Sequence, residues 1–291
     1  MTKRRGHVFR SLALMLLAGM LTACARSGDD DLGRALTDAP KYGKFVWHDL
    51  LTDDLEAARA FYGPLLGWSF EAAQRPAGGP YTVIRSAQGQ VVGGMLEVED
   101  PGDGADYSRW LGYYAVPDVD AAADTFAGAG GQVLIEPRDL AMVARAAVVR
   151  DPDGAVVGLV TSRIGYPIDQ LRLDEGDVAW NELVTVDPEG SAALYAGLTA
   201  STVREEARGD FTYRMLRNEG RERAGVMARP DEDIEPFWLT YFAVGDPAAA
   251  AARATELGGE VLLAPTPEVR NGTIALVTDP NGAILGLRQN R

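Results

Sequence analysis

The sequence of 291 residues contains one cysteine, Cys24, and only two histidines, His7 and His48. A single thiol excludes a disulfide within the chain, and two imidazoles leave little material for a Ser-His-Asp site. The longest apolar stretch, from Leu12 to Leu21, is far shorter than the roughly 20 residues that a membrane-spanning helix needs. Positive charge is also scarce: 28 Lys and Arg face 42 Asp and Glu, and the resulting net charge of −14 disfavours nucleic acid as a partner.

The amino terminus has the organisation of a bacterial secretion signal. Basic residues precede the apolar stretch, and "LTAC" at positions 21–24 follows it. This segment resembles the lipobox of bacterial lipoproteins, in which the cysteine becomes the lipidated first residue. We therefore expect residues 1–23 to be a lipoprotein signal peptide and Cys24 to be the lipidation site. Removal of the signal peptide would delete four basic side chains and change the net charge from −14 to −18.

The segment that follows Cys24 indicates where the protein resides. Residues 24–43 are polar and lack sustained apolar periodicity, so we expect a flexible tether. Ala25 occupies the position at which an inner-membrane retention signal would carry Asp, and the lipoprotein resemblance therefore favours the periplasmic face of the outer membrane. We expect the folded body to contact a membrane through its lipid anchor only.

A repeat of four units organises the rest of the chain. "KFVWHDLLTDDLEAARAFY" from residue 44 and "DVAWNELVTVDPEGSAALY" from residue 177 share a strand, an Asp suited to cap a helix, and an Ala-rich helix. Two more copies place the capping residue at Asp118 and Asp246, alongside Asp54 and Asp187 in the first two. Short segments rich in β-branched and aromatic residues follow each helix. The pattern predicts an α+β fold of four βαβββ units.

Several motifs give this repeat a family resemblance. "FYGPLLGW" (61–68), "DPDGAVVGL" (151–159) and "DPNGAILGL" (279–287), with the paired units, resemble the vicinal oxygen chelate superfamily, which includes glyoxalase I, extradiol dioxygenases and bleomycin-resistance proteins. The resemblance implies that two units form one cupped sheet, with the ligand in the cup. We therefore expect glyoxalase-like domains at 44–162 and 178–291, joined by a linker at 163–177.

Enzymes of that superfamily hold a divalent metal with His, Glu or Gln side chains in the cup. Carried over to this chain, the ligand positions fall on Trp47, Met95, Leu111, Gly158, Trp180, Met227, Leu239 and Gly286. None of these residue types supplies a suitable donor. We therefore expect no metal and no other cofactor.

Alternation along the strands predicts which side chains face each cup. Trp47 and Asp49 should lie on one face of their strand, and His48 should point away from the cup toward the covering helix. The set expected to bind ligand is Trp47, Asp49, Met95, Leu111, Tyr113 and Gly158 in the first cup, and Trp180, Glu182, Met227, Leu239, Tyr241 and Gly286 in the second. An aromatic concavity with one placed carboxylate is typical of a small-molecule site, although the same side chains could simply fill the cup.

Three functions remain open from the sequence. The first is a lipid-anchored, metal-independent protein that binds a small molecule in one or both cups. The second is a metal-dependent lyase or dioxygenase, which needs ligands that the motifs lack. The third is a non-catalytic scaffold whose working surface lies elsewhere. No "GxSxG" nucleophile motif and no glycine-rich phosphate loop favours another class of enzyme.

Overall fold

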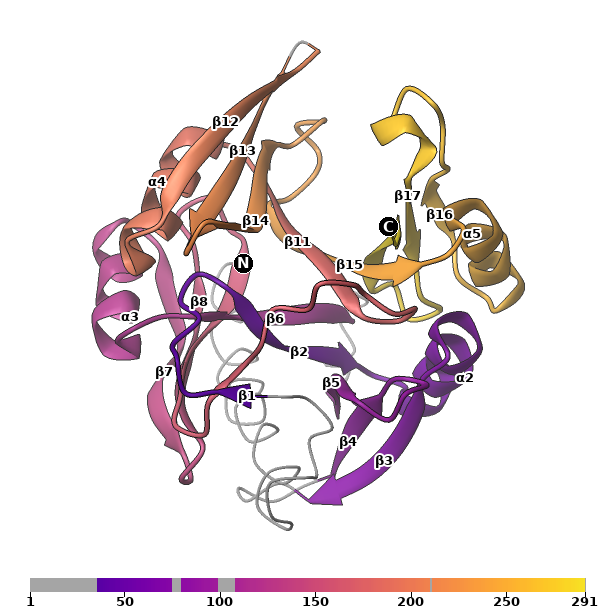
Figure 1. Cartoon of the computed structure of the whole chain (residues 1–291), viewed down its shortest axis with the longest axis horizontal. Coiled ribbons are helices and arrows are strands. Elements are labelled where there is room, and N and C mark those ends of the chain that lie inside the picture. Colours follow the sequence, from indigo (N-terminus) through magenta and orange to yellow (C-terminus); the bar gives the residue numbers. More distant parts are fainter. Residues whose placement is uncertain (1–35, 75–79, 99–107, 210, 291) are drawn as a thin grey trace, which may run out of the picture.

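The computed structural model describes residues 36–74, 80–98, 108–209 and 211–290, which form two eight-stranded mixed β-sheets flanked by α-helices (Figure 1). The expected signal peptide and Cys24 lie outside the described residues. Within the described residues, no helix has both the length and the apolar composition needed to span a membrane. The predicted α+β class is confirmed.

The first sheet is built from two βαβββ units. Its strand order is β3-β4-β5-β2-β6-β9-β8-β7, so the first strands of the two units, β2 and β6, are antiparallel neighbours at its centre. The elements are β2 (Phe45–Thr52), α2 (Leu55–Leu66), β3 (Ser69–Gln74), β4 (Pro80–Arg85), β5 (Val91–Glu97), β6 (Arg109–Ala115), α3 (Val119–Gly128), β7 (Gln132–Leu140), β8 (Ala144–Arg150) and β9 (Val156–Ser162).

The second sheet repeats this plan with the order β12-β13-β14-β11-β15-β18-β17-β16. Its elements are β11 (Val178–Thr185), α4 (Pro188–Thr199), β12 (Thr202–Arg208), β13 (Phe211–Asn218), β14 (Arg221–Ala228), β15 (Phe237–Val244), α5 (Pro247–Glu256), β16 (Val261–Leu263), a 3-10 turn (Arg270–Gly272), β17 (Ile274–Thr278) and β18 (Ile284–Gln289). We call the concave faces of the two sheets the first cup and the second cup.

The four helices begin where the repeat predicts. Asp54, Asp118, Asp187 and Asp246 are the N-cap residues, and each carboxylate accepts hydrogen bonds from backbone N–H groups of the first helical turn. These bonds satisfy donors that the helix itself leaves unpaired, which fixes each helix start.

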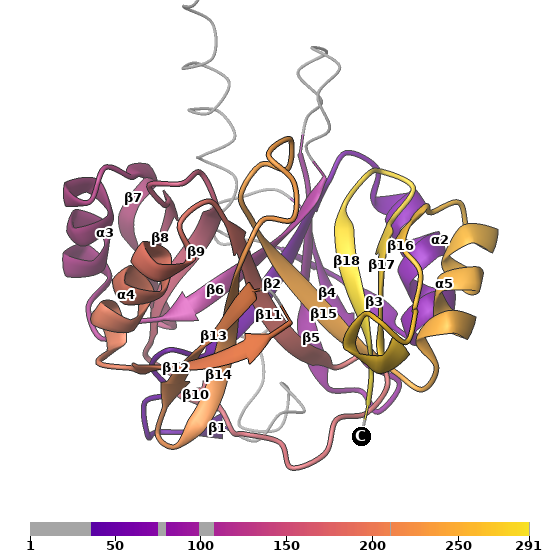
Figure 2. The ribbon, with the colours of Figure 1, turned by 90° about the horizontal axis from the view of Figure 1, so that it is seen from above.

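The convex faces of the two sheets pack against each other, so the cups open in opposite directions (Figures 1 and 2). The helices flank this contact in two pairs, α2 with α5 and α3 with α4. One core cluster joins residues of α2 and α5, and a second joins residues of α3 and α4 with strands of both sheets. The domains therefore share their hydrophobic core.

Two equivalent hydrogen-bond chains join the domains. Tyr62 on α2 donates to Asp279 of the second domain at 3.0 Å, and Trp110 donates to the Tyr62 hydroxyl at 3.0 Å. In the counterpart, Trp238 donates to Tyr195 of α4 at 3.0 Å, and Tyr195 donates to Asp151 of the first domain at 3.2 Å. The "FY" and "DP" motifs that identified the repeat thus also bind one domain to the other.

The segment that precedes the first domain differs from the expected tether. Leu36–Thr37 forms strand β1, which pairs with β10 (Tyr166–Pro167) inside the predicted linker. Tyr42 also makes an edge contact with Tyr166 at 6.1 Å between ring centroids. Residues 36–43 therefore lie on the folded body, because backbone pairing and an aromatic contact hold a segment whose composition alone indicated flexibility.

Candidate functional site

The floor of the first cup is a cluster of aromatic side chains around one carboxylate. Trp47 Nε1 donates to Asp49 Oδ1 at 2.9 Å, and the Tyr81 hydroxyl donates to the same oxygen at 2.7 Å. Tyr113, opposite Trp47 in the register of β2 and β6, also hydrogen-bonds with Asp49. Asp49, Tyr81 and Tyr113 are all buried. The predicted convergence of Trp47, Asp49 and Tyr113 is confirmed, and Leu111 lies on the same face.

The second cup repeats this cluster around a glutamate. The hydroxyls of Tyr213 and Tyr241 donate to the two oxygens of Glu182 at 2.5 and 2.9 Å, and Trp180 Nε1 donates to Tyr213 at 3.0 Å. Arg270, in the 3-10 turn before β17, also pairs with Glu182. The predicted convergence of Trp180, Glu182 and Tyr241 is confirmed. Leu239 packs in the same cluster, and Met227 lies opposite Val184 on the cup side of β14.

Burial makes the tyrosine hydroxyls of both clusters harder to ionise than exposed ones. It raises the pKa of Tyr113 and Tyr241 well above the usual value, and the charges of Asp49 and Glu182 raise them further. Burial alone would lower the pKa of Arg270, but the charge of Glu182 and the interactions with Tyr213 and Tyr241 together outweigh burial and raise the pKa. Tyrosine hydroxyls donate to both oxygens of Glu182, whereas an indole N–H and a tyrosine hydroxyl donate to the same oxygen of Asp49, Oδ1. Such donors offset the cost of burying a charge.

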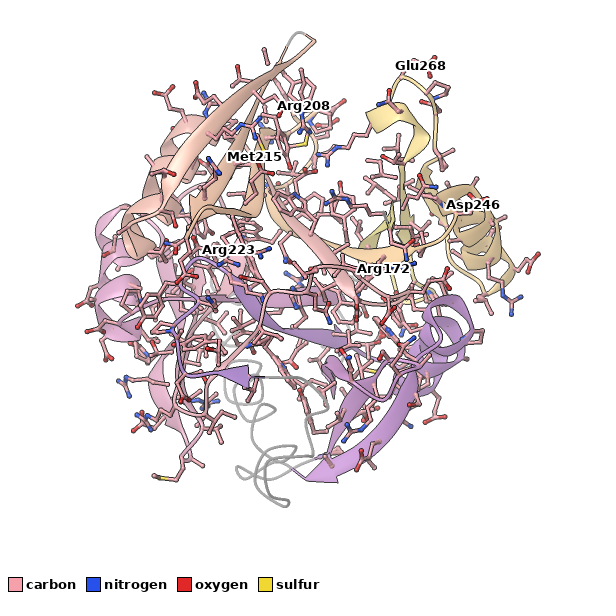
Figure 3. The ribbon with its side chains drawn as sticks, in the orientation of Figure 1. Arg172, Arg208, Met215, Arg223, Asp246 and Glu268 are labelled. Atoms are coloured by element: carbon pink, nitrogen blue, oxygen red, sulfur yellow. The ribbon has the colours of Figure 1, made fainter. Side chains whose placement is uncertain are left out.

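Arginine side chains cover part of the second cup. The guanidinium of Arg208, at the end of β12, lies 3.9 Å from the centroid of the Tyr213 ring. Figure 3 shows Arg208 on one rim of this cup and Glu268 across the opening, on the loop before β17. The guanidinium of Arg270 lies 5.0 Å from the Tyr213 ring centroid and 6.0 Å from that of Tyr241. These cations pack on the faces of the aromatic floor.

The prediction that Met95 faces the first cup is wrong. Met95 lies opposite Leu50 in the pairing of β5 with β2, and both side chains point into the core behind the sheet. Gly94 lies opposite Asp49 and takes the cup-side position. Because side chains alternate between faces, a misalignment of one residue moves the side chain to the other side of the sheet. The structural counterpart of Met95 in the second domain is Val226, opposite Leu183.

Tyrosine rings close the glycine positions of both cups. A Cβ atom placed on Gly158 would lie 2.2 Å from the ring of Tyr113, and one on Gly286 would lie 2.1 Å from the ring of Tyr241. The same holds for Gly94 and Gly225, whose added Cβ atoms would lie 1.7 and 1.8 Å from the hydroxyls of Tyr81 and Tyr213. Glycine is required here so that the tyrosines can lie flat on the strands.

His48 points away from the first cup, as alternation predicts, but its neighbour is not a helix. Its Nε2 hydrogen-bonds with Oδ1 of Asn181, the equivalent residue of the second domain, at 2.9 Å. Thr240 also donates to that Asn181 oxygen at 3.2 Å. His48 and Asn181 are both buried where the convex faces meet. The back-to-back packing of the domains therefore gives His48 a structural partner in the interface.

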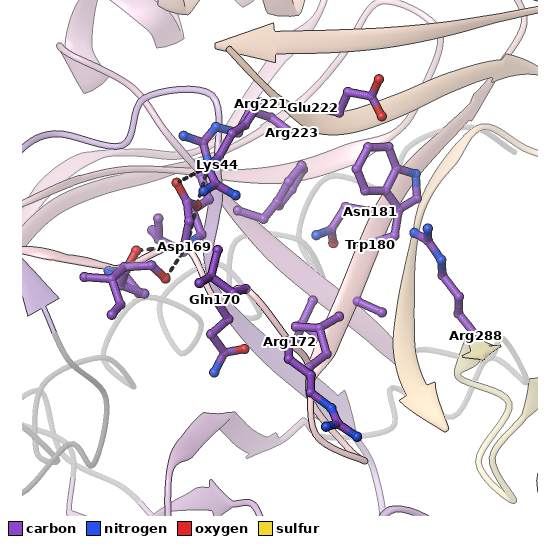
Figure 4. A pocket seen from close by; sticks show the side chains of 18 of the residues that line it. Lys44, Asp169, Gln170, Arg172, Trp180, Asn181, Arg221, Glu222, Arg223 and Arg288 are labelled. Atoms are coloured by element: carbon purple, nitrogen blue, oxygen red, sulfur yellow. Dashed lines mark hydrogen bonds and ion pairs between the residues drawn. The ribbon is translucent and has the colours of Figure 1, made fainter. Parts of the chain in front are cut away.

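A pocket of about 730 Å³ lies beside Trp180, between the domains and under the linker (Figure 4). Its wall combines the start of β2, linker residues 167–173, the beginning of β11, the turn between β13 and β14, and the end of β18. Of the twelve residues expected to bind ligand, only Trp180 lines it. This pocket lies at the edge of the second sheet, where β11 has not yet paired with β14, and the sequence did not predict it.

Comparison with known proteins now gives the family. The sequence model of the Glyoxalase/Bleomycin resistance protein/Dioxygenase superfamily matches residues 44–159 and 178–287. The chain belongs to this superfamily. It is 35% identical over 246 residues to "Putative glyoxylase CFP32" of Mycobacterium tuberculosis, covering 83% of this chain and 92% of that protein. It is also 31% identical to "Anthracycline biosynthesis protein DnrV" of Streptomyces peucetius, with 83% and 91% covered.

Solved structures of the superfamily share the fold. The Mn(II)-bound glyoxalase of Novosphingobium aromaticivorans superposes with a TM-score of 0.57 at 17% identity, covering 86% of this chain and 83% of that one. A 2,2',3-trihydroxybiphenyl 1,2-dioxygenase of Sphingomonas wittichii gives 0.55 at 14% identity, covering 86% and 91%. At these identities the likeness concerns architecture alone.

The residues of this chain do not fit the metal that its superfamily implies. The positions that would supply ligands hold Trp, Leu, Met or Gly, and tyrosine rings cover the glycines. Each cup has one buried carboxylate, and tyrosine hydroxyls donate to it. No group of three or more His, Cys, Asp or Glu side chains among the described residues is placed to hold a metal ion. A hard or borderline cation needs several such donors at one point.

Proposed function

We propose that this chain is a metal-independent, small-molecule-binding member of the superfamily, held at the cell envelope by a lipid on Cys24. The observation that carries the proposal is the difference between the cup floors and the pocket beside Trp180. Among the described residues, neither cup floor gathers three side chains able to hold a metal ion, whereas a pocket of about 730 Å³ lies beside the half-buried Trp180. A concavity of this size with aromatic and polar walls is of the kind that binds small molecules.

The buried clusters argue against the alternative of a metal-dependent lyase or dioxygenase. Such an enzyme needs several metal-binding side chains in the cup, but the ligand positions hold apolar residues or glycines, and tyrosine rings cover the glycines. The relatives named for anthracycline biosynthesis are in keeping with a small-molecule ligand. The proposed binding site is therefore the pocket at the edge of the second sheet and not the floor of either cup. Trp180 belongs both to the set expected from the sequence and to the lining of this pocket.

Tryptophan fluorescence tests this function directly. Trp68, Trp110 and Trp238 are 5–6% exposed, so a bound aromatic ligand should quench mainly Trp180. In a screen of small aromatic acids, amines and neutral aromatics, at least one class should quench the full chain saturably. Trp180→Phe should remove the response, whereas the matched change Trp47→Phe, at the equivalent position of the other domain, should keep it. EDTA should leave the affinity unchanged. A response that EDTA removes, or none that depends on Trp180, would contradict the proposal.

Membrane attachment is a separate expectation. Cys24→Ser should move the protein from the detergent phase to the aqueous phase, because the tether offers no other apolar anchor. The thermal unfolding midpoint should stay within about 1 °C, since the core clusters of the described residues are built from the two domains. Phase partitioning of wild type and variant measures the first effect and circular dichroism the second. A variant that stays in the detergent phase while folded would show that anchoring has another cause.

A further inference from the structure

We infer that the pocket beside Trp180 selects organic acids, binding the carboxylate through arginines and the apolar body through the linker and Trp180; this inference rests on the proposed function. The lining is strongly cationic. Six basic side chains, Lys44, Arg172, Arg217, Arg221, Arg223 and Arg288, face two acidic ones, Asp169 and Glu222. This excess of four positive charges gathers in a chain whose net charge is −14.

The two carboxylates of the lining do not neutralise its cations. Asp169 alone faces three of them, at 2.6 Å from Arg223, 3.2 Å from Lys44 and 3.4 Å from Arg221. Burial by itself would raise the pKa of Asp169, but the bond from Arg223 and the charge of Lys44 outweigh it and lower the pKa. Glu222 pairs at 2.7 Å with Arg204, which does not line the pocket. The lining therefore keeps more basic than acidic side chains, although Glu219, outside the lining, also pairs with Arg223.

The basic side chains divide into a fixed wall and a reachable set. Arg223 has a side-chain exposure of 3% and is held by Asp169 and Glu219, so it forms part of the wall. Arg221 has a side-chain exposure of 49%, and Arg172 is exposed on the linker. The guanidinium of Arg288 lies 5.7 Å from the Trp180 ring centroid, and Figure 4 shows the two side chains next to each other. Guanidinium groups on several sides suit a planar carboxylate.

Apolar side chains of the linker indicate that the anion carries an apolar body. Leu171 is 95% exposed and Ile168 is 44% exposed, and both line the pocket. Phe45 and Val178 add apolar surface from the first strands of the two domains. A ligand between Trp180 and the linker would cover this surface while its carboxylate meets the arginines. A small inorganic anion would leave the apolar surface uncovered.

The experiment compares two probes of the same shape and different charge. 2-Naphthoate and its neutral isostere 2-naphthamide are titrated into the full chain, with Trp180 fluorescence and isothermal calorimetry as readouts. We expect naphthoate to bind at least tenfold more tightly. The triple change Arg172→Gln, Arg221→Gln and Arg288→Gln should bring the two affinities within twofold by weakening naphthoate alone. The same three positions changed to Lys keep the charge and should retain a preference of several-fold.

Controls separate the failure of this inference from the failure of the proposed function. Arg253→Gln removes one charge on α5, far from the pocket lining, and should leave both affinities unchanged. Equal binding of naphthoate and naphthamide would overturn the organic-acid class and leave the proposed function standing. If Arg208→Gln weakens naphthoate binding and the triple change does not, the anion binds in the second cup, and the inference is overturned. If neither probe gives a signal that Trp180→Phe removes, the organic-acid inference falls, and the proposed function is then decided by the other classes of the fluorescence screen.

Discussion

Gly286→Ala is expected to lower the free energy of unfolding by about 3 kcal/mol, the upper end of the usual effect of overpacking a core. The added methyl group would lie 2.1 Å from the Tyr241 ring, close to the point where the ring joins its own chain. Tyr241 is 2% exposed and its hydroxyl is bonded to Glu182, so the ring cannot move aside without breaking that bond. Urea denaturation followed by circular dichroism measures the change.

Two further substitutions make this result specific. Gly158→Ala should cost a similar amount, because it presses on Tyr113 at 2.2 Å in the first cup. Gly128→Ala, at the exposed end of α3 with no atom within 4 Å of the new Cβ, should instead be neutral or stabilise by up to about 1 kcal/mol. If Gly286→Ala were as stable as Gly128→Ala, Tyr241 would not be fixed over Gly286. The conclusion that a tyrosine ring covers this ligand position would then be wrong.

Local sequence patterns were sufficient to predict most of the fold. Four Asp residues followed by Ala-rich stretches marked four helix starts correctly, because capping depends on the residue itself and its next few neighbours. Strict alternation then placed Trp47 with Asp49 and Trp180 with Glu182 on the cup side. Alternation depends only on backbone geometry within one strand, and the bulges just before Trp47 and Trp180 leave the residues that follow in phase.

Contacts between strands were harder to predict. Met95 was assigned to the cup by a loose alignment with the superfamily's fourth-strand ligand position. That alignment was wrong by one residue, and the side chain of Met95 lies on the other face of the sheet. The contributions of Tyr81 and Tyr213 were missed, although both residues lie in predicted strands. The two tyrosines are 132 residues apart, so a comparison of the two halves of the sequence could have identified them as equivalent positions on the cup side. Arg270 carries no such signal, because a loop side chain finds Glu182 only through the tertiary fold.

The interdomain features lay beyond sequence reasoning altogether. His48 meets Asn181, and the pocket beside Trp180 exists, only because two sheets pack back to back with the linker across their edge. Alternation along a strand and capping of a helix are local features, and neither predicts which faces of two domains will pack together. The same packing explains why basic residues scattered from Lys44 to Arg288 converge on one cavity in an acidic chain.

The acid of the second cup is expected to support the fold, and Glu182→Ala should lower the free energy of unfolding by about 3 to 5 kcal/mol at pH 7. Glu182 is 2% exposed, and its loss removes the acceptor of two buried tyrosine hydroxyls and the partner of Arg270. Arg270→Ala should cost less, because the carboxylate keeps its bonds from Tyr213 and Tyr241. The double variant should be less destabilised than the sum, with a coupling of about 1 to 3 kcal/mol.

A surface pair gives the matched control for this cycle. Arg253 and Glu256 on α5 lie 2.8 Å apart with side-chain exposures of 47% and 65%, and exposed pairs of this kind couple by about 0.2 to 1 kcal/mol at most. Urea denaturation of all the single and double variants yields both coupling energies. Full stability in Glu182→Ala, together with loss of naphthoate binding, would mean that this carboxylate recognises ligand; the second cup would then be the binding site and the tyrosines around Glu182 its floor.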